Sequence, residues 1–385
     1  MTWEIHPSNR GTGLPLEGLR VLDLSRVLAG PLCAMIAGDL GADVIKVEGP
    51  GGDPVRALAP PVLGEDATYY LAVNRHRRAI VADLRDAQDF AAIAELVGQA
   101  DAVVENYLPN QVAALGIDEL RAVNPEAIWV TVTPATSGGP VAAQPSFDLL
   151  AQARSGLMGV TGERDGAPTK VGSPVADVIT GLYATVALLT GLYARATGHP
   201  ARTFEAPLLE STMSALVNQA QGYLSTGVNP QRLGNDHPSI APYGPVRTAD
   251  GYLLLAVGTD AQYARLAATV GDPELTQPEW ETNAGRVRDL PRLRRALDHA
   301  FSREGTETWL ERLAQAAIPH GPIYDVAGAF AQPQIAGGDF VSEMDTPSGM
   351  TRAMRLPLVV DGKRPAIRRG PRPFGADNRE VLGRD

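Results

Sequence analysis

The chain has 385 residues, 44% of them hydrophobic and 20% charged, which is the composition of a globular protein rather than a disordered one. Its formal net charge of −10 argues against nucleic acid or an anionic membrane as the main partner, because both select basic surfaces. The single cysteine, Cys33, excludes an internal disulfide and a cysteine-based metal cluster. The length predicts two or three domains.

The segment 175–194 is about long enough to span a bilayer. It contains Asp177, three threonines, two glycines and two tyrosines, which are unusual inside a membrane span. The first residues, MTWEIHPSNRGTG, lack the basic region and apolar core of a signal peptide. We therefore expect a buried helix in a soluble, cytoplasmic protein that has no membrane partner.

From Leu19 onward, short apolar runs alternate with helical patterns. Strands are predicted at 19–25, 43–49, 78–84, 101–107 and 128–134, and helices at 29–42, 86–100 and 111–124. Strands that alternate with helices of this length indicate parallel βαβ units and a doubly wound sheet. The fold class that we expect is α/β, with a Rossmann-like large domain and a smaller α+β domain.

The second half of the chain predicts the division into domains. A helix is expected over 145–160, then a long helix after Asp177, a strand over 201–211 and a helix to about Thr226. The composition changes to Gly, Pro and Asn over 227–244. We expect a large domain over 1–226, a smaller domain over 227–325, and a partly β-structured tail, 326–385, that returns to the large domain.

Several common catalytic motifs are absent from the sequence. The six histidines never occur at HxxxH or HxH spacing, so a zinc site is not expected. There is no GxSxG nucleophile elbow and no GxxxxGK[ST] phosphate loop. The first strand-to-helix turn, DLSRVLAG, lacks GxGxxG, which argues against NAD or FAD. We expect no metal and no tightly bound cofactor, and carboxylate chemistry remains.

Asp177 is the only charged residue between Lys170 and Arg195. An unpaired carboxylate in such a segment loses solvation or becomes protonated. Two structural explanations are open: an aspartate at a helix start, which complements the helix dipole, or a core carboxylate with a buried partner. The functional explanation is a nucleophile or proton-transfer group in a dry pocket.

Ligands of doubly wound sheets bind at the carboxyl ends of the strands. Arg26 and Arg85 follow predicted strands, and guanidinium groups suit phosphate, so both are candidates for holding a phosphorylated ligand. The alternative, for these and for Arg75, Arg77 and Arg78, is a solvated basic face.

Collinear blocks across almost the whole chain resemble the class III CoA transferases, also called the CaiB/BaiF family. They include LEGLRVLDLSRVLAGPLCAMIAGDLGADVIKVEGPGGDPVR, YYLAVNRHRRAIVADL, DAVVENYLPN, FDLLAQARSGLMGVTGE, GSPVADVITGLYA, GNDHPSIAPYGPVRTADGYLLLAVG and IPHGPIYDV. The resemblance runs from about residue 14 to the C-terminal PFG…EVLG segment, and it implies a family-type interlocked homodimer.

The resemblance also implies an activity. Family members move CoA from an acyl-CoA donor to a carboxylic acid acceptor, through an aspartyl anhydride and an aspartyl-CoA thioester. Asp177 matches the position of the nucleophilic aspartate. Coenzyme A and acyl-CoA are then substrates, and the central and C-terminal blocks look most like the branch that uses succinyl-CoA or another dicarboxylyl-CoA.

Positions that line the CoA path in the family carry over to the ends of several predicted strands. They are Arg26, Val27, Leu28, Ala82, Leu84, Arg85, Asn106, Tyr107, Thr133 and Ala135. Two departures argue against formyl-CoA and oxalate as substrates: Ala114 stands where formyl-CoA transferases have an arginine, and TPAT replaces a glycine and an aromatic residue.

The related α-methylacyl-CoA racemases carry a histidine in a GHD triplet, and that histidine pairs with the aspartate. Here the triplet is Ser146-Phe147-Asp148. Phenylalanine cannot exchange a proton, so two-base racemisation is disfavoured and Asp148 is expected to be a structural helix residue. An acyl-CoA racemase or isomerase is nevertheless the alternative function, together with a non-catalytic CoA-binding protein.

Overall fold

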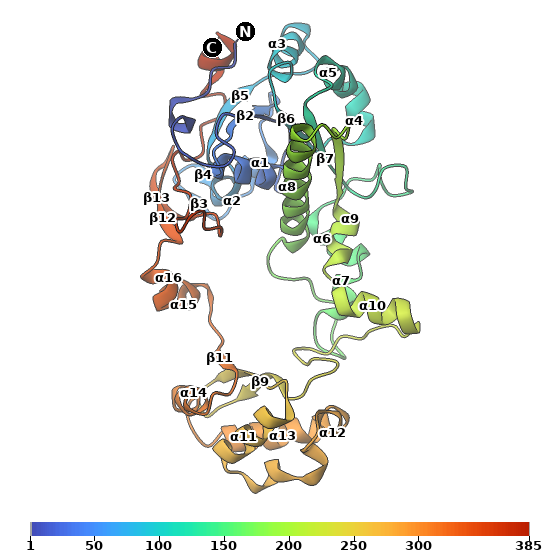
Figure 1. Ribbon diagram of the computed structural model, residues 1–385, viewed down its shortest axis with the longest axis vertical. Helices are drawn as coiled ribbons and strands as arrows, with labels where there is room; N and C mark the ends of the chain where they lie inside the picture. The colour runs from blue at the N-terminus through green and yellow to red at the C-terminus, as the bar shows by residue number, and fades with distance from the viewer. Residues whose placement is uncertain (1, 385) are drawn as a thin grey trace. The chain divides into compact units, whose positions relative to one another are not determined.

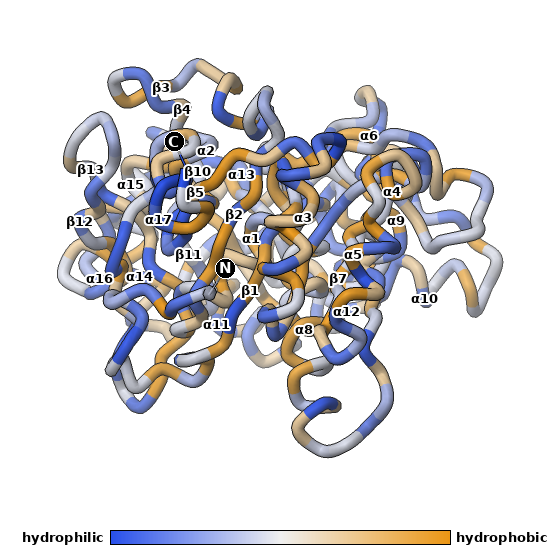
Figure 2. The backbone as a smooth tube through the Cα atoms, turned by 90° about the horizontal axis from the view of Figure 1, so that it is seen from above, coloured by the Kyte–Doolittle hydropathy of each residue, from blue (hydrophilic) through white to orange (hydrophobic). Residues whose placement is uncertain are grey.

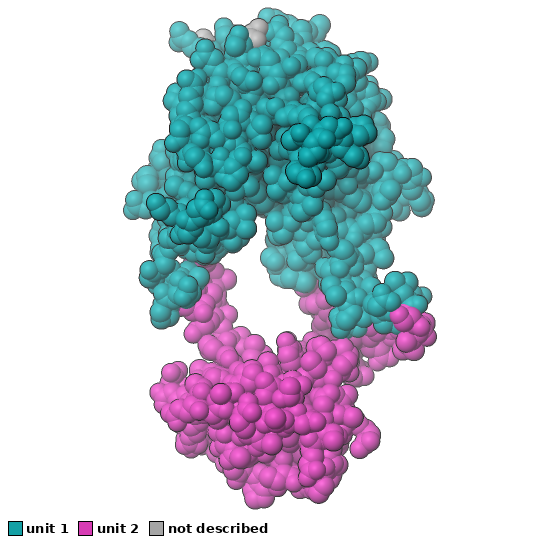
Figure 3. Space-filling model, in the orientation of Figure 1, with its two compact units in different colours: residues 1–157, 171–224, 333–385 teal, residues 158–170, 225–332 magenta. Residues whose placement is uncertain are grey.

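The structure of the protein is a computed structural model that describes residues 2–384. These residues form two compact units (Figure 3). Unit 1 comprises residues 2–157, 171–224 and 333–384, and unit 2 comprises residues 158–170 and 225–332. The expected domain boundaries at 226/227 and 325/326 stay predictions.

A six-stranded parallel sheet forms the centre of unit 1 (Figure 1). Its spatial order is β5–β2–β1–β6–β7–β8, which is 3-2-1-4-5-6 when these strands are counted along the chain, as in Rossmann sheets. The expected fold class is confirmed. The strands are β1 (Arg20–Asp23), β2 (Asp43–Glu48), β5 (Arg77–Val81), β6 (Ala102–Glu105), β7 (Ile128–Thr133) and β8 (Thr203–Pro207).

Helices cover both faces of this sheet, and each face has its own apolar core. Helices α1 (Ala29–Asp39) and α8 (Val175–Ala196) lie side by side on one face (Figure 1). Helices α3 (Ala87–Val97), α5 (Ile117–Val123) and the C-terminal α17 (Asn378–Leu382) pack on the other. Alternating side chains of one strand enter different cores: Val21 of β1 faces α1, and Leu22 faces α3.

Small residues allow α8 to lie against α1 and the sheet. A Cβ atom at Gly181 would lie 2.9 Å from the Ala29 carbonyl oxygen of α1, and one at Gly191 would lie 2.8 Å from Phe204 of β8. The buried side of α8 consists of Ala176, Thr180, Gly181, Ala184, Thr185, Leu188, Gly191 and Ala194. The close contact fixes the position of the whole helix.

The opposite side of α8 is apolar and exposed, so the expectation of a buried helix holds for one face only. Its exposed side chains are Val178, Leu182, Tyr183, Val186, Leu189 and Tyr193. By length and composition, α8 is the one helix among residues 2–384 that is apolar enough to cross a membrane, and much of its tube is orange in Figure 2.

Three predicted elements are interrupted. The helix expected over 111–124 is split at Gly116, whose φ of +65° separates α4 (Pro109–Ala114) from α5. Gly156, at φ +88°, likewise separates α6 (Asp148–Arg154) from α7 (Leu157–Val160). The strand expected over 201–211 ends at Pro207, where α9 (Leu208–Ser214) begins. Glycine adopts a positive φ at little cost, and an α-helix cannot continue through a residue with that backbone conformation.

The remaining elements of unit 1 are short. They are β3 (Val62–Leu63), β4 (Asp66–Ala67), α2 (Thr68–Val73), α16 (Pro333–Ala336), β12 (Val341–Thr346) and β13 (Gly349–Met354), and 3-10 helices occur at Pro7–Asn9 and Pro54–Ala57. Strands β12 and β13 form an antiparallel hairpin. Helix α10 (Val217–Thr226) leads from unit 1 into unit 2.

Unit 2 is an antiparallel sheet with helices around it. The sheet order is β11–β10–β9, and Trp280, Phe301 and Trp309 lie in its core. Its elements are β9 (Tyr243–Arg247), β10 (Tyr252–Ala256), α11 (Asp260–Val270), α12 (Asn283–Arg288), α13 (Leu290–Phe301), α14 (Thr306–Gln315), β11 (His320–Pro322) and α15 (Val326–Ala331), with 3-10 helices at Pro273–Thr276 and Pro278–Trp280.

The packing of α8 predicts the effect of Gly191→Ala. The added methyl group overlaps Ile128 and Phe204, and overpacking of this kind costs about 1–3 kcal/mol, which exceeds the helix-propensity gain of up to about 1 kcal/mol. We expect a lower Tm in thermal unfolding. Gly222→Ala on α10, where nothing lies within 4 Å of the added atom, is the matched control and should leave Tm unchanged or raise it. An unchanged Tm for Gly191→Ala would contradict the close packing.

Candidate active site

Asp177 lies in the first turn of α8, where Pro174 is the residue that precedes the helix. Its side chain is half-buried, and among residues 2–384 no hydrogen bond or ion pair reaches its carboxylate. Burial, and after it the negative charge of Asp148, raise the pKa of Asp177 to about 7. Neither structural explanation accounts fully for this carboxylate. It lies at a helix start, but among the described residues it has no buried partner that neutralises its charge.

Asp148 and Gln152 of α6 hold the chain that leads into α8. The Ala176 N–H donates to Asp148 Oδ1 at 2.8 Å, so Asp148 satisfies a backbone donor of the first turn of α8. Gln152 donates to Asp148 Oδ2 at 2.6 Å and accepts from the Val171 N–H at 2.8 Å. These bonds agree with the structural role expected for Asp148. Phe147 beside it is 62% exposed.

Tyr69 of α2 is a neighbour of Asp177 that the sequence analysis did not identify. Burial, and after it the charges of Asp177, Asp148 and Asp53 in that order, raise the pKa of the Tyr69 hydroxyl to about 12. The phenol therefore stays protonated at neutral pH. It is a hydrogen-bond donor within the electrostatic range of these three carboxylates. No motif in the sequence connects residue 69 with residue 177, which lies 108 positions later.

The first βα turn, residues 25–28, meets the end of β6 at the point where the strand order reverses. Asn106 accepts from the Arg26 N–H at 3.0 Å and donates to the Arg26 carbonyl oxygen at 2.8 Å. The Arg26 guanidinium carbon lies 5.4 Å from the centre of the Tyr107 ring. The structure thus brings together Arg26, Val27, Asn106 and Tyr107, at the place where doubly wound sheets bind ligands.

The other predicted CoA contacts lie at neighbouring strand ends. Ala82 and Leu84 are buried after β5. The Arg85 side chain is 69% exposed and forms an ion pair with Asp83 at 2.9 Å. Among residues 2–384, its guanidinium has no hydrogen bond or ion pair with Arg26, Asn106 or Tyr107. Thr133 donates to Glu205 at 2.7 Å, and Ala135 is buried beside it. Thr133 and Ala135 are therefore on the β8 side of the site.

The basic cluster of the sequence is not a solvated face. Arg75, Arg77 and Arg78 are all buried. Their guanidinium groups form ion pairs with Asp39, Asp23 and Asp43 respectively. Buried charges are held by such partners, so these arginines are structural and have no free side for phosphate.

A cavity of about 530 Å³ opens beside Tyr107 and Thr133, at the carboxyl ends of β6 and β7 and beside the first residues of β8. Its ionisable walls are Glu105, Asp118, Arg121 and Glu205. Three carboxylates against one guanidinium make this cavity a poor place for a carboxylate substrate.

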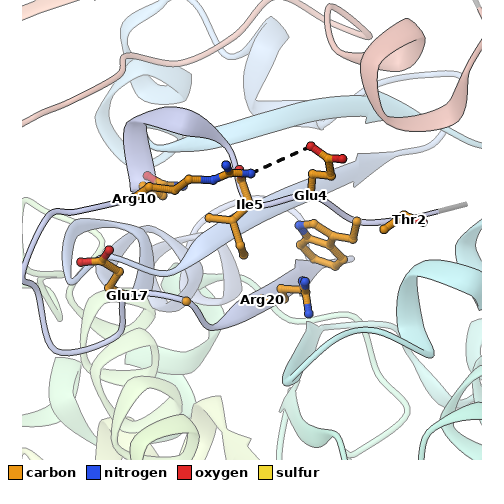
Figure 4. A pocket seen from close by; sticks show the side chains of 9 residues that line it. Thr2, Glu4, Ile5, Arg10, Glu17 and Arg20 are labelled. Atoms are coloured by element: carbon orange, nitrogen blue, oxygen red, sulfur yellow. Dashed lines mark hydrogen bonds and ion pairs between the residues drawn. The ribbon is translucent and has the colours of Figure 1, made fainter.

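A second cavity, of about 340 Å³, lies under the N-terminal arm at the amino end of β1 (Figure 4). It is lined by residues that include Glu4, Arg10 and Arg20, and Arg10 lies 3.9 Å from Glu4. Arg20 is the first residue of β1, at the end of that strand opposite to the turn 25–28. This cavity is therefore separate from the Asp177 region. Among residues 2–384 there is no group of three or more His, Cys, Asp or Glu side chains that could hold a metal ion.

Comparisons with known proteins identify the family of the chain. A family model described as CoA-transferase family III matches residues 16–378. The chain is 37% identical to human succinyl-CoA:glutarate CoA-transferase, over 87% of this chain and 77% of the relative. It is 38% identical to a succinate–glutarate CoA-transferase of Agrobacterium fabrum, over 90% of this chain and 89% of the relative.

Solved structures show the same fold. A CaiB/BaiF family protein from Brucella suis aligns with a TM-score of 0.85 at 34% identity, over 96% of this chain and 99% of the other. The family match, the identity to curated relatives and the shared fold all extend over most of the chain. The protein is therefore an enzyme that belongs to CoA-transferase family III.

Proposed function

We propose that this CoA transferase moves CoA from an acyl-CoA donor to a carboxylic acid acceptor, with Asp177 as the nucleophile. The observation that carries the proposal is the half-buried, unpaired carboxylate in the first turn of α8. With a pKa of about 7, about half of the Asp177 side chains are ionised at neutral pH. A poorly solvated carboxylate near a helix start is a better nucleophile than one in water.

The chemistry balances without a separate acid or base. Asp177 attacks the thioester carbonyl, the C–S bond breaks, and CoA leaves as a thiolate from an aspartyl–acyl anhydride. The thiolate attacks the aspartyl carbonyl, which forms an aspartyl-CoA thioester and releases the donor acid. The acceptor carboxylate attacks this thioester, giving a second anhydride and the thiolate. Attack of the thiolate on the acceptor acyl carbonyl yields the new acyl-CoA and restores Asp177.

The neighbours of Asp177 have supporting roles in this scheme. The protonated hydroxyl of Tyr69 is a donor for the negative charge that develops on a carbonyl oxygen during attack. The burial that raises the pKa of Asp177 also limits water, which would hydrolyse the anhydride and the thioester. We place CoA at the turn 25–28 and at Asn106 and Tyr107, with the remaining predicted contacts at the ends of β5 and β7.

We propose succinyl-CoA or another dicarboxylyl-CoA as the donor. The support is that relatives named for succinyl-CoA, glutarate and mesaconate are 34–38% identical to this chain. A relative from Acetobacter aceti named acetyl-CoA:oxalate CoA-transferase is 36% identical, so oxalate belongs in the test despite the departures at Ala114 and TPAT. Mass detection of new thioesters over a panel of donors and acids identifies the pair.

Racemisation receives no support from the site. Phe147 carries no exchangeable proton, and Asp148 is already bonded to the Ala176 N–H. Deuterium incorporation at the α-carbon of an acyl-CoA, without an acceptor acid, would contradict this conclusion. Tight CoA binding without turnover on any acid would instead indicate the non-catalytic alternative.

We also propose that the protein is a cytoplasmic homodimer. The exposed face of α8, which the rest of unit 1 leaves uncovered, is a contiguous apolar surface, and such surfaces on soluble proteins mark interaction sites. A second copy of the chain is the expected cover, in line with the interlocked dimer that the family resemblance implies.

Asp177→Asn tests the nucleophile. The amide cannot form the anhydride, so kcat should fall by about three orders of magnitude or more. In the unmodified enzyme, acyl-CoA with hydroxylamine should convert the Asp177 side chain to a hydroxamate, which peptide mass spectrometry detects. Glu343→Gln on β12 is the control and should keep full activity. If Asp177→Asn retained full activity, the mechanism would be wrong.

The pKa of Asp177 predicts the pH profile. Only the ionised carboxylate attacks, so kcat/KM should fall about tenfold per pH unit below pH 7 and level off above it. Asp148→Asn removes the negative charge that contributes to the raised pKa, while its side-chain oxygen still accepts from Ala176. The acid limb should move to lower pH in this variant and stay in place in Glu343→Gln. An unmoved limb in Asp148→Asn would show that Asp148 does not affect the titration.

Leu182→Glu tests the dimer. A charge at the centre of the exposed α8 face cannot be buried without a partner, so the assembly should shift to monomer in sedimentation or light-scattering measurements. Val123→Glu changes a side chain of similar exposure on α5, away from this face, and should leave the assembly unchanged. A monomeric unmodified protein would exclude the dimer.

A further inference from the structure

The turn 25–28 holds a backbone conformation that its own sequence does not favour. Val27 has a φ of +71°, in the left-handed region that β-branched residues rarely adopt. Such a conformation persists only where the surrounding structure imposes it, and it is concentrated at functional sites. Side chains from other parts of unit 1 impose it here.

Asp53 is the side chain that reaches Val27 directly. Its Oδ1 atom accepts from the Val27 N–H at 3.2 Å and from the Val55 N–H at 3.1 Å. Its Oδ2 atom lies 2.9 Å from the Lys46 ammonium. Both charged side chains are completely buried, so neither has water as an alternative partner.

Lys46 connects this carboxylate to the other end of the turn. From β2, its ammonium donates to the Ser25 carbonyl oxygen at 2.9 Å and lies 3.8 Å from Asp23 Oδ2. Asp23 accepts from the Ser25 N–H at 3.0 Å and from the Ser25 hydroxyl. Asn106, directly after β6, bonds to both backbone groups of Arg26 between them. Every residue from Ser25 to Val27 is thus held by a side chain from another segment.

We infer that Lys46 and Asp53 are positioning residues for CoA, because they hold the turn 25–28 in the conformation that CoA contacts. The inference rests on the proposed function, which places CoA at this turn. Neither side chain reaches the ligand itself, since both are buried beneath the turn. A buried pair that served stability alone would not need to join the two ends of a strained loop.

The matched control is the buried ion pair of Arg75 with Asp39. Arg75 Nη2 lies 2.6 Å from Asp39 Oδ2, both side chains are buried, and the pair has no bond to residues 25–28. Replacing the cation of either pair removes the main partner of a buried carboxylate and destabilises the fold, although His76 Nε2 still lies 3.2 Å from Asp39 Oδ1. The two variants therefore differ in what they do to the turn.

Lys46→Met, Arg75→Met and the unmodified enzyme are compared in three measurements: Tm, the Kd for CoA by calorimetry, and steady-state kinetics. Lys46→Met should raise the Kd for CoA and the KM for the acyl-CoA donor about tenfold, which corresponds to about 1.4 kcal/mol. The KM for the acceptor acid should stay unchanged. Arg75→Met should lower Tm but leave the Kd unchanged in the folded protein.

A second variant distinguishes positioning from general damage. Glycine adopts positive φ without steric cost, so Val27→Gly in the Lys46→Met background should recover CoA affinity, whereas it cannot restore a lost ion pair. If Lys46→Met folds and binds CoA as the unmodified enzyme does, the inference is wrong. If Lys46→Met does not fold, Asp53→Asn replaces it, and an unchanged Kd there overturns the inference equally. If the unmodified enzyme binds no CoA, the proposed function fails instead.

Discussion

The close packing of α8 on α1 and the sheet is the constraint on which the candidate site depends. An unpaired carboxylate tends to move towards water or towards a cation, and a loosely attached helix would allow either. Gly181 and Gly191 remove the side chains that would hold α8 away, and Asp148 satisfies the backbone at its first turn. Asp177 is then fixed on a rigid element rather than on a loop, and its carboxylate stays without a partner.

The turn 25–28, the other part of the candidate site, is held by buried ion pairs rather than by close packing of small residues. The turn 25–28 contains no glycine, yet it includes a left-handed residue, and buried ions enforce its shape. Burial of Lys46 and Asp53 costs solvation free energy. Their bonds to the backbone of Ser25 and Val27 hold the shape of the turn, which an apolar pair could not do. The two halves meet where α1 starts, because the carbonyl oxygen of Ala29 faces Gly181.

The sequence alone predicted the parallel sheet and its helices, because apolar runs of the right period are a local signal. The isolated charge singled out Asp177, and the family resemblance supplied its expected role and most of the strand-end positions. The helix breaks at Gly116 and Gly156 depended on backbone angles that no pattern reveals. Tyr69, and the link from Lys46 through Asp53 to Val27, join residues that the fold brings together across long sequence separations. Arg75, Arg77 and Arg78 looked like a surface cluster because their acidic partners lie on other strands and helices.

The contact between Gly181 and Ala29 has a kinetic consequence. It holds α8, which carries Asp177, against α1, which begins directly after the turn 25–28. The distance between Asp177 and this turn is therefore set by backbone packing and cannot adapt to the substrate. Under the proposed chemistry, the donor acyl group and the acceptor acid must use the same space beside Asp177 in succession. The two acids should therefore exclude one another, and a saturating acceptor should inhibit by occupying the enzyme before the donor arrives.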